Sequence, residues 1–147
     1  MTQIEKWDRR FLQLAYTIAG WSKDPSSKVG AVIADTSNRV VSLGYNGLPK
    51  LIVDDETRLA DRDTRLLMTV HAEPNAILFA VRNLGGTKIH VTHHPCSRCA
   101  ALIAQSGICT VVAYQSDPEF VKRWSADIEI AKTIFYEAGV SYREYSR

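Results

Sequence analysis

Apolar residues fall at two different spacings along the chain, and stretches of the two kinds follow one another. Runs in which every third or fourth residue is apolar predict amphipathic helices, whereas short runs of consecutive or alternating apolar residues predict strands. The first kind of run predicts four helices, over residues 4–20, 72–83, 96–106 and 124–138. The second kind predicts five strands, over residues 29–34, 39–43, 88–92, 108–114 and 140–145.

The order of these elements predicts an α/β fold with helices on both faces of a mixed sheet. Residues 44–70 stand apart, because they are polar and rich in turn residues, with a charged stretch at 54–65. A long connection of this kind inside a compact domain is usually functional. The 147 residues match the size of a single domain.

Two short motifs carry residues that suit a metal ion. His71-Ala72-Glu73 begins one predicted helix, and Pro95-Cys96-Ser97-Arg98-Cys99 begins another. A catalytic zinc ion keeps three nitrogen or sulfur ligands from the protein and leaves its fourth position to water. His71, Cys96 and Cys99 make three. The two thiols share one face of a first helical turn, where the helix N-terminus favours the thiolate form.

Glu73 follows the histidine at a distance of two residues, so we expect it to face the fourth coordination position instead of binding the ion. Zinc lowers the pKa of a bound water from 15.7 to about 7. Glu73 would take the proton of that water and deliver it to a ring nitrogen and to the leaving ammonia. The two motifs together predict a zinc-dependent hydrolytic deaminase of nucleobases.

Two other interpretations of the cysteine pair are open at this point. A structural zinc site needs a fourth ligand, which His93, His94 or Cys109 could supply. A thioredoxin-like redox pair would follow a βαβ pattern, which the chain does not show before Cys96. The carboxylate after the histidine and the proline before the first cysteine favour the catalytic site. We expect Cys109 to be a small buried residue and His90 to be a packed or edge histidine of its strand and not a metal ligand.

Composition excludes several classes of protein. Hydrophobic residues make up 46% and charged residues 23% of the chain, as in ordinary globular domains. The net charge of +2 is too small to indicate nucleic-acid binding, and no apolar run is long enough to cross a membrane. Three cysteines without a signal peptide are typical of a reducing compartment, so we expect a cytoplasmic protein without nucleic-acid or membrane partners.

Four blocks in the right order, covering almost the full length, resemble the deoxycytidylate (dCMP) deaminase family of the cytidine deaminase-like superfamily. The blocks are Ser22–Ala31, Gly44–Pro49, Val70–Ile77, and Pro95–Cys99 with Gln105–Ile108. The resemblance implies one domain of residues 1–147, folded as a three-layer α/β/α sandwich around a central mixed five-stranded sheet. It also implies zinc-dependent hydrolysis of dCMP to dUMP and ammonia, which supplies dUMP for thymidylate synthesis.

The same resemblance implies that His71, Cys96 and Cys99 bind one zinc ion and that Glu73 is the proton shuttle. We expect a single ion, because Asp24 lies in the region where some family members carry an extra cysteine for a second one. The resemblance suggests that Ala72 holds the pyrimidine through its backbone.

Other substrate contacts are less specific in the sequence. The resemblance suggests that Asn46 binds the sugar; an amide suits a hydroxyl, but an asparagine beside a glycine is also an ordinary turn residue. Tyr45 and Tyr114 are candidates to pack near the base, although aromatic residues are more often part of a core. Hydroxyls, loop N–H groups and ammonium groups suit a phosphate dianion, or else form a solvated loop. The phosphate candidates are Ser26, Ser27, Lys28 and Lys23.

The resemblance further implies regulation and assembly. Activation by dCTP and inhibition by dTTP would use a site between subunits at Gly44, Tyr45, Asn46 and Gly47, where a bound triphosphate would bring Mg²⁺. A homo-oligomer, with a hexamer favoured, is expected. The alternatives are a deaminase of another nucleotide or base on the same fold (5-substituted dCMP, CMP, dCTP) and a zinc-stabilised binding module. Glu73 argues against the binding module, because a structural site has no need of that carboxylate.

Overall fold

A five-stranded mixed sheet forms the centre of the protein in the computed structural model, which describes residues 1–147. The strands are β1 (Gly30–Ala34), β2 (Val40–Tyr45), β3 (Lys88–Val91), β4 (Thr110–Tyr114) and β5 (Ser141–Tyr145). They lie in the order β2-β1-β3-β4-β5. Strand β1 is antiparallel to both β2 and β3, whereas β3, β4 and β5 run parallel. The predicted mixed sheet is confirmed.

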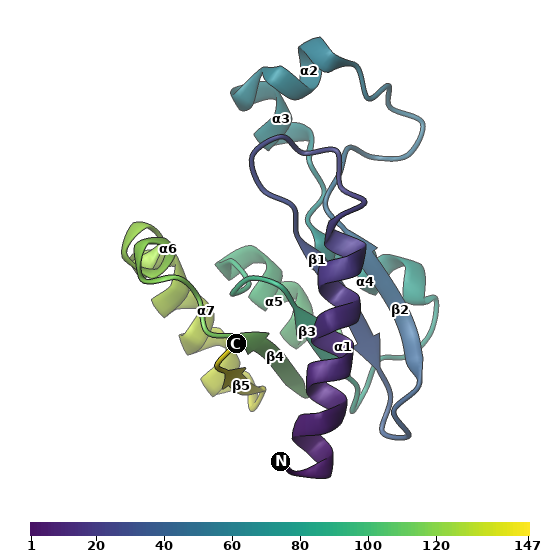
Figure 1. Ribbon diagram of the computed structural model, residues 1–147, viewed down its shortest axis with the longest axis vertical. Coiled ribbons are helices and arrows are strands. Elements are labelled where there is room, and N and C mark those ends of the chain that lie inside the picture. The colour runs from purple at the N-terminus through teal and green to yellow at the C-terminus, as the bar shows by residue number, and fades with distance from the viewer.

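Helices cover both faces of this sheet, so the molecule has three layers (Figure 1). The helices are α1 (Gln3–Ala19), α2 (Glu56–Ala60), α3 (Arg62–Met68), α4 (Ala72–Ala80), α5 (Ser97–Gln105), α6 (Pro118–Arg123) and α7 (Ser125–Ala138). Helix α1 packs on one face, and α4, α5 and α7 contribute to the core on the other. The α/β/α sandwich implied by the family resemblance is therefore confirmed.

Strand β1 shows how the sequence fills both layers. Successive side chains of a strand point to opposite faces, so an apolar run of five residues supplies two cores. Val32 and Ala34 pack against α1, while Ala31 and Ile33 belong to the larger core with residues of α4, α5 and α7. All five residues of β1 are buried, which explains why this strand reads as a continuous apolar run.

Two glycines allow helices to lie directly against the sheet. A Cβ atom at Gly30 would come within 2.0 Å of the Ala15 carbonyl oxygen of α1. A Cβ atom at Gly44 would come within 2.5 Å of the Ala72 carbonyl oxygen, in the first turn of α4. Gly44 therefore sets how closely the beginning of α4, where two residues of the candidate site lie, approaches β2.

Three short helices were not predicted from the sequence. Helices α2 and α3 lie within residues 44–70, which the sequence indicates only as a long connection, and α6 precedes α7. Neither α2 nor α6 buries any residue, and α3 buries only Arg65. Helices without an apolar face leave no periodic signal in the sequence. In Figure 1, α2 and α3 form a lobe that extends beyond the edge of the three layers.

Two single-residue predictions have opposite outcomes. The prediction that Cys109 is buried is wrong, because its side chain is exposed just before β4. The prediction for His90 is confirmed, since its ring is fully buried within β3. No helix combines the length and the apolar character needed to cross a membrane.

A buried carboxylate joins α1 to strands β3 and β5. Asp8 is 1% exposed, and it accepts hydrogen bonds from Arg143 Nη1 at 2.5 Å and from the Tyr145 hydroxyl at 2.9 Å. His90 Nε2 lies 3.1 Å from the other carboxylate oxygen. Burial by itself would raise the pKa of Asp8, but the hydrogen bonds from His90, Arg143 and Tyr145 outweigh it and lower that pKa to about 2.

Candidate active site

The three predicted metal ligands come from the beginnings of two helices. His71 is the N-cap of α4, and its imidazole makes no capping hydrogen bond, so the ring is free to bind an ion. Cys96 is the N-cap of α5, and Cys99 lies in the first turn of the same helix. Pro74 suits the first turn of α4, where a proline costs no helical hydrogen bond. Both helix N-termini therefore point their ligands at one place.

The ligand atoms lie at the separations that a tetrahedral zinc ion requires. His71 Nδ1 is 3.6 Å from Cys96 Sγ and 3.3 Å from Cys99 Sγ. Zinc–nitrogen and zinc–sulfur bonds of about 2.1 and 2.3 Å at a tetrahedral angle place the two ligand atoms about 3.6 Å apart. The group contains no fourth His, Cys, Asp or Glu ligand. Three ligands fit a zinc ion with an open position and not a closed structural site.

The three ligand groups also shift one another's pKa values. Interaction with the Cys99 thiol and with His71 lowers the pKa of Cys96 to about 4, so Cys96 is a thiolate at neutral pH. Interaction with that thiolate, together with burial, raises the pKa of Cys99. The Cys96 thiolate likewise raises the pKa of His71. A metal ligand must be deprotonated, so binding of an ion here would release the proton of Cys99.

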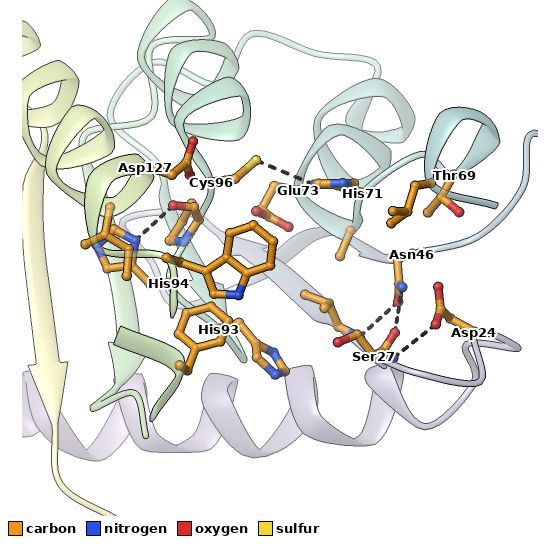
Figure 2. Close-up of a pocket in the computed structure, with 17 residues that line it drawn as sticks. Asp24, Ser27, Asn46, Thr69, His71, Glu73, His93, His94, Cys96 and Asp127 are labelled. Atoms are coloured by element: carbon orange, nitrogen blue, oxygen red, sulfur yellow. Dashed lines mark hydrogen bonds between the residues drawn. The ribbon is translucent and has the colours of Figure 1, made fainter. Parts of the chain in front are cut away.

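Glu73 lies beside the metal ligands, in the first turn of α4. Its side chain is 4% exposed, and Figure 2 shows the carboxylate next to Cys96 and His71, on the side of the cavity. Burial raises the pKa of Glu73. A carboxylate with a raised pKa exchanges protons more readily near neutral pH, which is the property needed of a general acid and base.

A cavity of about 310 Å³ opens onto this group (Figure 2). Figure 2 shows Asp24, Ser27, Asn46 and Thr69 on one side of the metal ligands, and His93, His94 and Asp127 on the other. The lining is largely apolar between these two polar ends, which is common in sites for small organic molecules.

Much of the cavity wall comes from residues that the sequence did not single out for substrate binding. His93, Phe120, Trp124 and Ile128 line one side, and the rings of His93 and Phe120 lie 5.9 Å apart. These residues come from the segment after β3, from α6 and from the first turns of α7. An aromatic wall of this kind suits a flat ring. No local motif marks it, because the residues meet only in the folded chain.

Asp127 has a more specific task at the same end of the cavity. Its carboxylate accepts hydrogen bonds from the Ser97 backbone N–H at 2.9 Å and from the Ser97 hydroxyl at 2.6 Å. An acidic side chain at a helix N-terminus satisfies free N–H groups and interacts well with the helix dipole. Asp127 on α7 therefore holds the first turn of α5, which carries both cysteine ligands.

The structure brings only some of the predicted substrate residues to the cavity. Ala72, Asn46 and Ser27 line it. The side chain of Asn46 also holds the segment before β1, because it accepts a hydrogen bond from the Val29 N–H at 2.9 Å and donates one to the Ser27 carbonyl at 2.8 Å. Asn46 therefore both lines the cavity and holds the segment before β1 in place.

The other predicted substrate residues lie away from the cavity wall. Lys23 forms an ion pair with Asp54 at 2.9 Å, and Lys28 donates to the Ser22 carbonyl. Ser26 is exposed outside the lining and accepts a hydrogen bond from Arg65. Tyr114 packs on Tyr16 and is not among the lining residues. The two lysines are therefore engaged with the protein itself.

Three of the four residues predicted to bind an effector line a second, smaller cavity of about 110 Å³. They are Tyr45, Asn46 and Gly47, and Lys23 joins them. The fourth, Gly44, is covered by α4 and has the packing role described above. The second cavity shares Asp24, Asn46 and Thr69 with the first, so the two are direct neighbours.

Known proteins resemble this chain over most of its length. The family model of the cytidine and deoxycytidylate deaminase zinc-binding region matches residues 5–115. A deaminase of Aliivibrio fischeri, itself uncharacterised, is 47% identical over 137 residues, which is 93% of this chain and 92% of the relative. The deoxycytidylate deaminase of Mus musculus is 37% identical over 147 residues, covering 96% of this chain and 80% of the relative.

Solved structures show the same fold. The dCMP deaminase of cyanophage S-TIM5, in complex with dCMP and dUMP, superposes with a TM-score of 0.75 at 22% identity, over 99% of both chains. A tRNA:A34 deaminase superposes less closely, with a TM-score of 0.56 at 22% identity, over 95% of this chain and 98% of the other. The fold is thus shared by enzymes that deaminate different bases.

Proposed function

The chain belongs to the cytidine and deoxycytidylate deaminase family, and on that premise we propose that it hydrolyses dCMP to dUMP and ammonia. The main support for the proposal is that three metal ligands and a buried glutamate lie together at one cavity. Relatives named deoxycytidylate deaminase, at 36–37% identity over most of the chain, support dCMP as the substrate.

Each residue of the site would have its own role in this reaction. His71, Cys96 and Cys99 would hold zinc, which supplies, when bound, a Lewis acid that makes water a nucleophile near neutral pH. Glu73 accepts one proton from the attacking water and delivers it to the ring nitrogen. It then carries the second proton of that water from the new hydroxyl on C4 to the amino group, so that the C–N bond breaks, the carbonyl forms and ammonia leaves. The wall of His93, Phe120 and Trp124 orients the flat ring and limits access of bulk water.

The test is ammonia release from dCMP, CMP, dCTP, deoxycytidine, 5-methyl-dCMP and adenosine, with the Glu73→Gln variant as a companion. Glu73→Gln is expected to keep its zinc and lower kcat by about 10²–10⁴-fold, the usual contribution of general acid–base catalysis. Turnover of dCMP by the variant at the wild-type rate would refute the role of Glu73. Turnover of another member of the panel in place of dCMP would refute the substrate.

The second cavity supports a proposal about regulation. Tyr45, Asn46 and Gly47 line it together with Lys23, whose ammonium group pairs with Asp54 of the same wall. The family resemblance makes dCTP and dTTP the proposed effectors, and the phosphates of either would have to displace Asp54 from Lys23. The curve of rate against dCMP concentration, measured with each triphosphate and Mg²⁺, would show a shift in half-saturation. If neither triphosphate changes the curve, the proposed regulation is wrong.

Exposed apolar side chains support a homo-oligomer, for which we propose a hexamer. Leu78, Phe79 and Val81 at the end of α4 are 67%, 59% and 88% exposed. Large exposed apolar side chains grouped in one segment are typical of protein–protein contact. Light scattering during size-exclusion chromatography would give the mass, and a monomer at micromolar concentration would contradict the proposal.

A further inference from the structure

The polar end of the main cavity lacks a cation. Its lining includes no lysine and no arginine, and its charged group at this end is the carboxylate of Asp24 (Figure 2). A nucleoside monophosphate carries up to two negative charges, so a bare carboxylate at this place would repel it. Some other group has to cancel the charge of Asp24 if the cavity is to accept a phosphate.

Arg65 of α3 lies directly behind Asp24. Its side chain is buried, and its Nε atom lies 3.5 Å from Asp24 Oδ2. The guanidinium donates hydrogen bonds to the Leu59 carbonyl at 2.7 Å and to the Ser26 hydroxyl at 2.9 Å. Nε itself makes no hydrogen bond, although it is buried. A buried arginine with one free donor is costly unless the nearby negative charge balances it.

Asp24 in turn occupies a small anion-binding arrangement. One carboxylate oxygen accepts from the Ser26 N–H at 2.8 Å and from the Ser27 N–H at 3.0 Å, while the other faces Arg65. Adjacent backbone N–H groups and a guanidinium are the donors that typically bind anions. The charge of Asp24 is therefore balanced by groups of the protein itself. The hydroxyl of Ser27 remains available to the cavity.

We propose that Arg65 is a positioning residue that gives this enzyme its preference for a 5′-phosphorylated pyrimidine nucleoside, by cancelling the charge of Asp24 at the cavity wall. The proposal rests on the deaminase function proposed above and adds to it the origin of phosphate selectivity. It differs from the prediction made from sequence, in which Lys23 and Lys28 supplied the positive charge. Both lysines are engaged elsewhere, whereas Arg65 faces a residue of the wall.

The test compares kcat/KM for dCMP with kcat/KM for deoxycytidine, which lacks the phosphate. Arg65→Gln leaves Asp24 uncompensated, so the ratio of the two values is expected to fall by about tenfold or more. Arg62→Gln is the matched control, because Arg62 is an exposed arginine on the same helix, and its ratio is expected to stay at the wild-type value. Arg65→Lys keeps the charge and is expected to keep most of the preference.

The double variant Asp24→Asn with Arg65→Gln decides how Arg65 acts. Removing both charges is expected to restore much of the preference for dCMP, since the repulsive carboxylate is gone. A double variant as poor as Arg65→Gln alone would overturn the proposal, because it would mean direct binding of the phosphate by Arg65. An equal fall in kcat/KM for both substrates in Arg65→Gln would also overturn it, because that outcome shows a purely structural role.

A binding measurement separates this proposal from the proposed function. The affinity for dUMP relative to deoxyuridine, followed by tryptophan fluorescence, gives the same comparison without turnover. Wild-type protein that binds dUMP more tightly than deoxyuridine, and loses this difference in Arg65→Gln, supports the role of Arg65 even if dCMP is not turned over. Circular dichroism and zinc content of each variant confirm that the fold is intact.

Discussion

The buried carboxylate of Asp8 makes a quantitative prediction about stability. In the folded protein its pKa is lowered from 3.8 to about 2 by His90, Arg143 and Tyr145. At ~1.36 kcal/mol for each pH unit, that difference corresponds to about 2.5 kcal/mol of stabilisation by the ionised group. Asp8→Asn keeps the size of the side chain and removes the charge, so we expect the free energy of unfolding at pH 7 to fall by about 2–3 kcal/mol.

The pH dependence gives the sign of the effect. Because the pKa of Asp8 is lower in the folded state, its contribution is fully present above the unfolded value of 3.8 and is lost as the pH falls through about 2. Urea unfolding, followed by tryptophan fluorescence from pH 7 down to pH 2, measures it in wild type and variant. Asp63→Asn is the control, since Asp63 is exposed on α3.

The expected result is a gap between wild type and Asp8→Asn that is constant from pH 7 to about pH 5 and closes toward pH 2. The Asp63→Asn curve should follow the wild type within about 0.5 kcal/mol, as surface substitutions usually do. A gap that is absent at pH 7, or one that persists unchanged at pH 2, would refute the assignment of the stabilisation to the ionised carboxylate.

Two further predictions concern the packing and the ligands of the site. Gly44→Ala places a methyl group within 2.5 Å of the Ala72 carbonyl oxygen and would displace the start of α4. We therefore expect urea unfolding to show a loss of about 1–3 kcal/mol of stability. We also expect atomic absorption to show a lower zinc content. An unchanged midpoint would contradict this. Cys99→Ala is expected to abolish zinc binding in the same assay, whereas Cys109→Ser should retain one ion per chain because Cys109 lies outside the ligand group; zinc loss from the latter would mean that the ligand set is wrong.

The meeting of His71, Cys96 and Cys99 at one place could be predicted from the sequence, because the chemistry of a metal site constrains the spacing within each motif. Cys96 and Cys99 lie three residues apart in one helical turn, and His71 and Glu73 begin another helix, so the spacing alone indicates which atoms face one another. The fold then has only to bring the two motifs side by side. The core strands were also predictable, because β1 and β4 are buried on both faces and read as continuous apolar runs.

The remainder of the site depends on contacts between segments that carry no periodic signal. Helix α3 buries a single residue, Arg65, and that residue is charged, so neither hydrophobic spacing nor composition marks it. Asp127 holds Ser97 across 30 residues, and its position is set by the packing of α7 on α5. The exposure of Cys109 likewise follows from its place before β4 and not from the type of residue.

The placement of the ligands at two helix N-termini has a consequence for how the protein responds to its supply of metal. His71 begins α4 and Cys96 begins α5, and Cys96 follows His71 by 25 residues, with β3 between them. An ion held between them would act as a removable cross-link between two neighbouring helices on the same face of the sheet. Binding of the ion would then stabilise the folded protein, by about 2.7 kcal/mol when free zinc exceeds its dissociation constant a hundredfold. A cell that limits zinc would thereby lower the amount of folded enzyme as well as its activity.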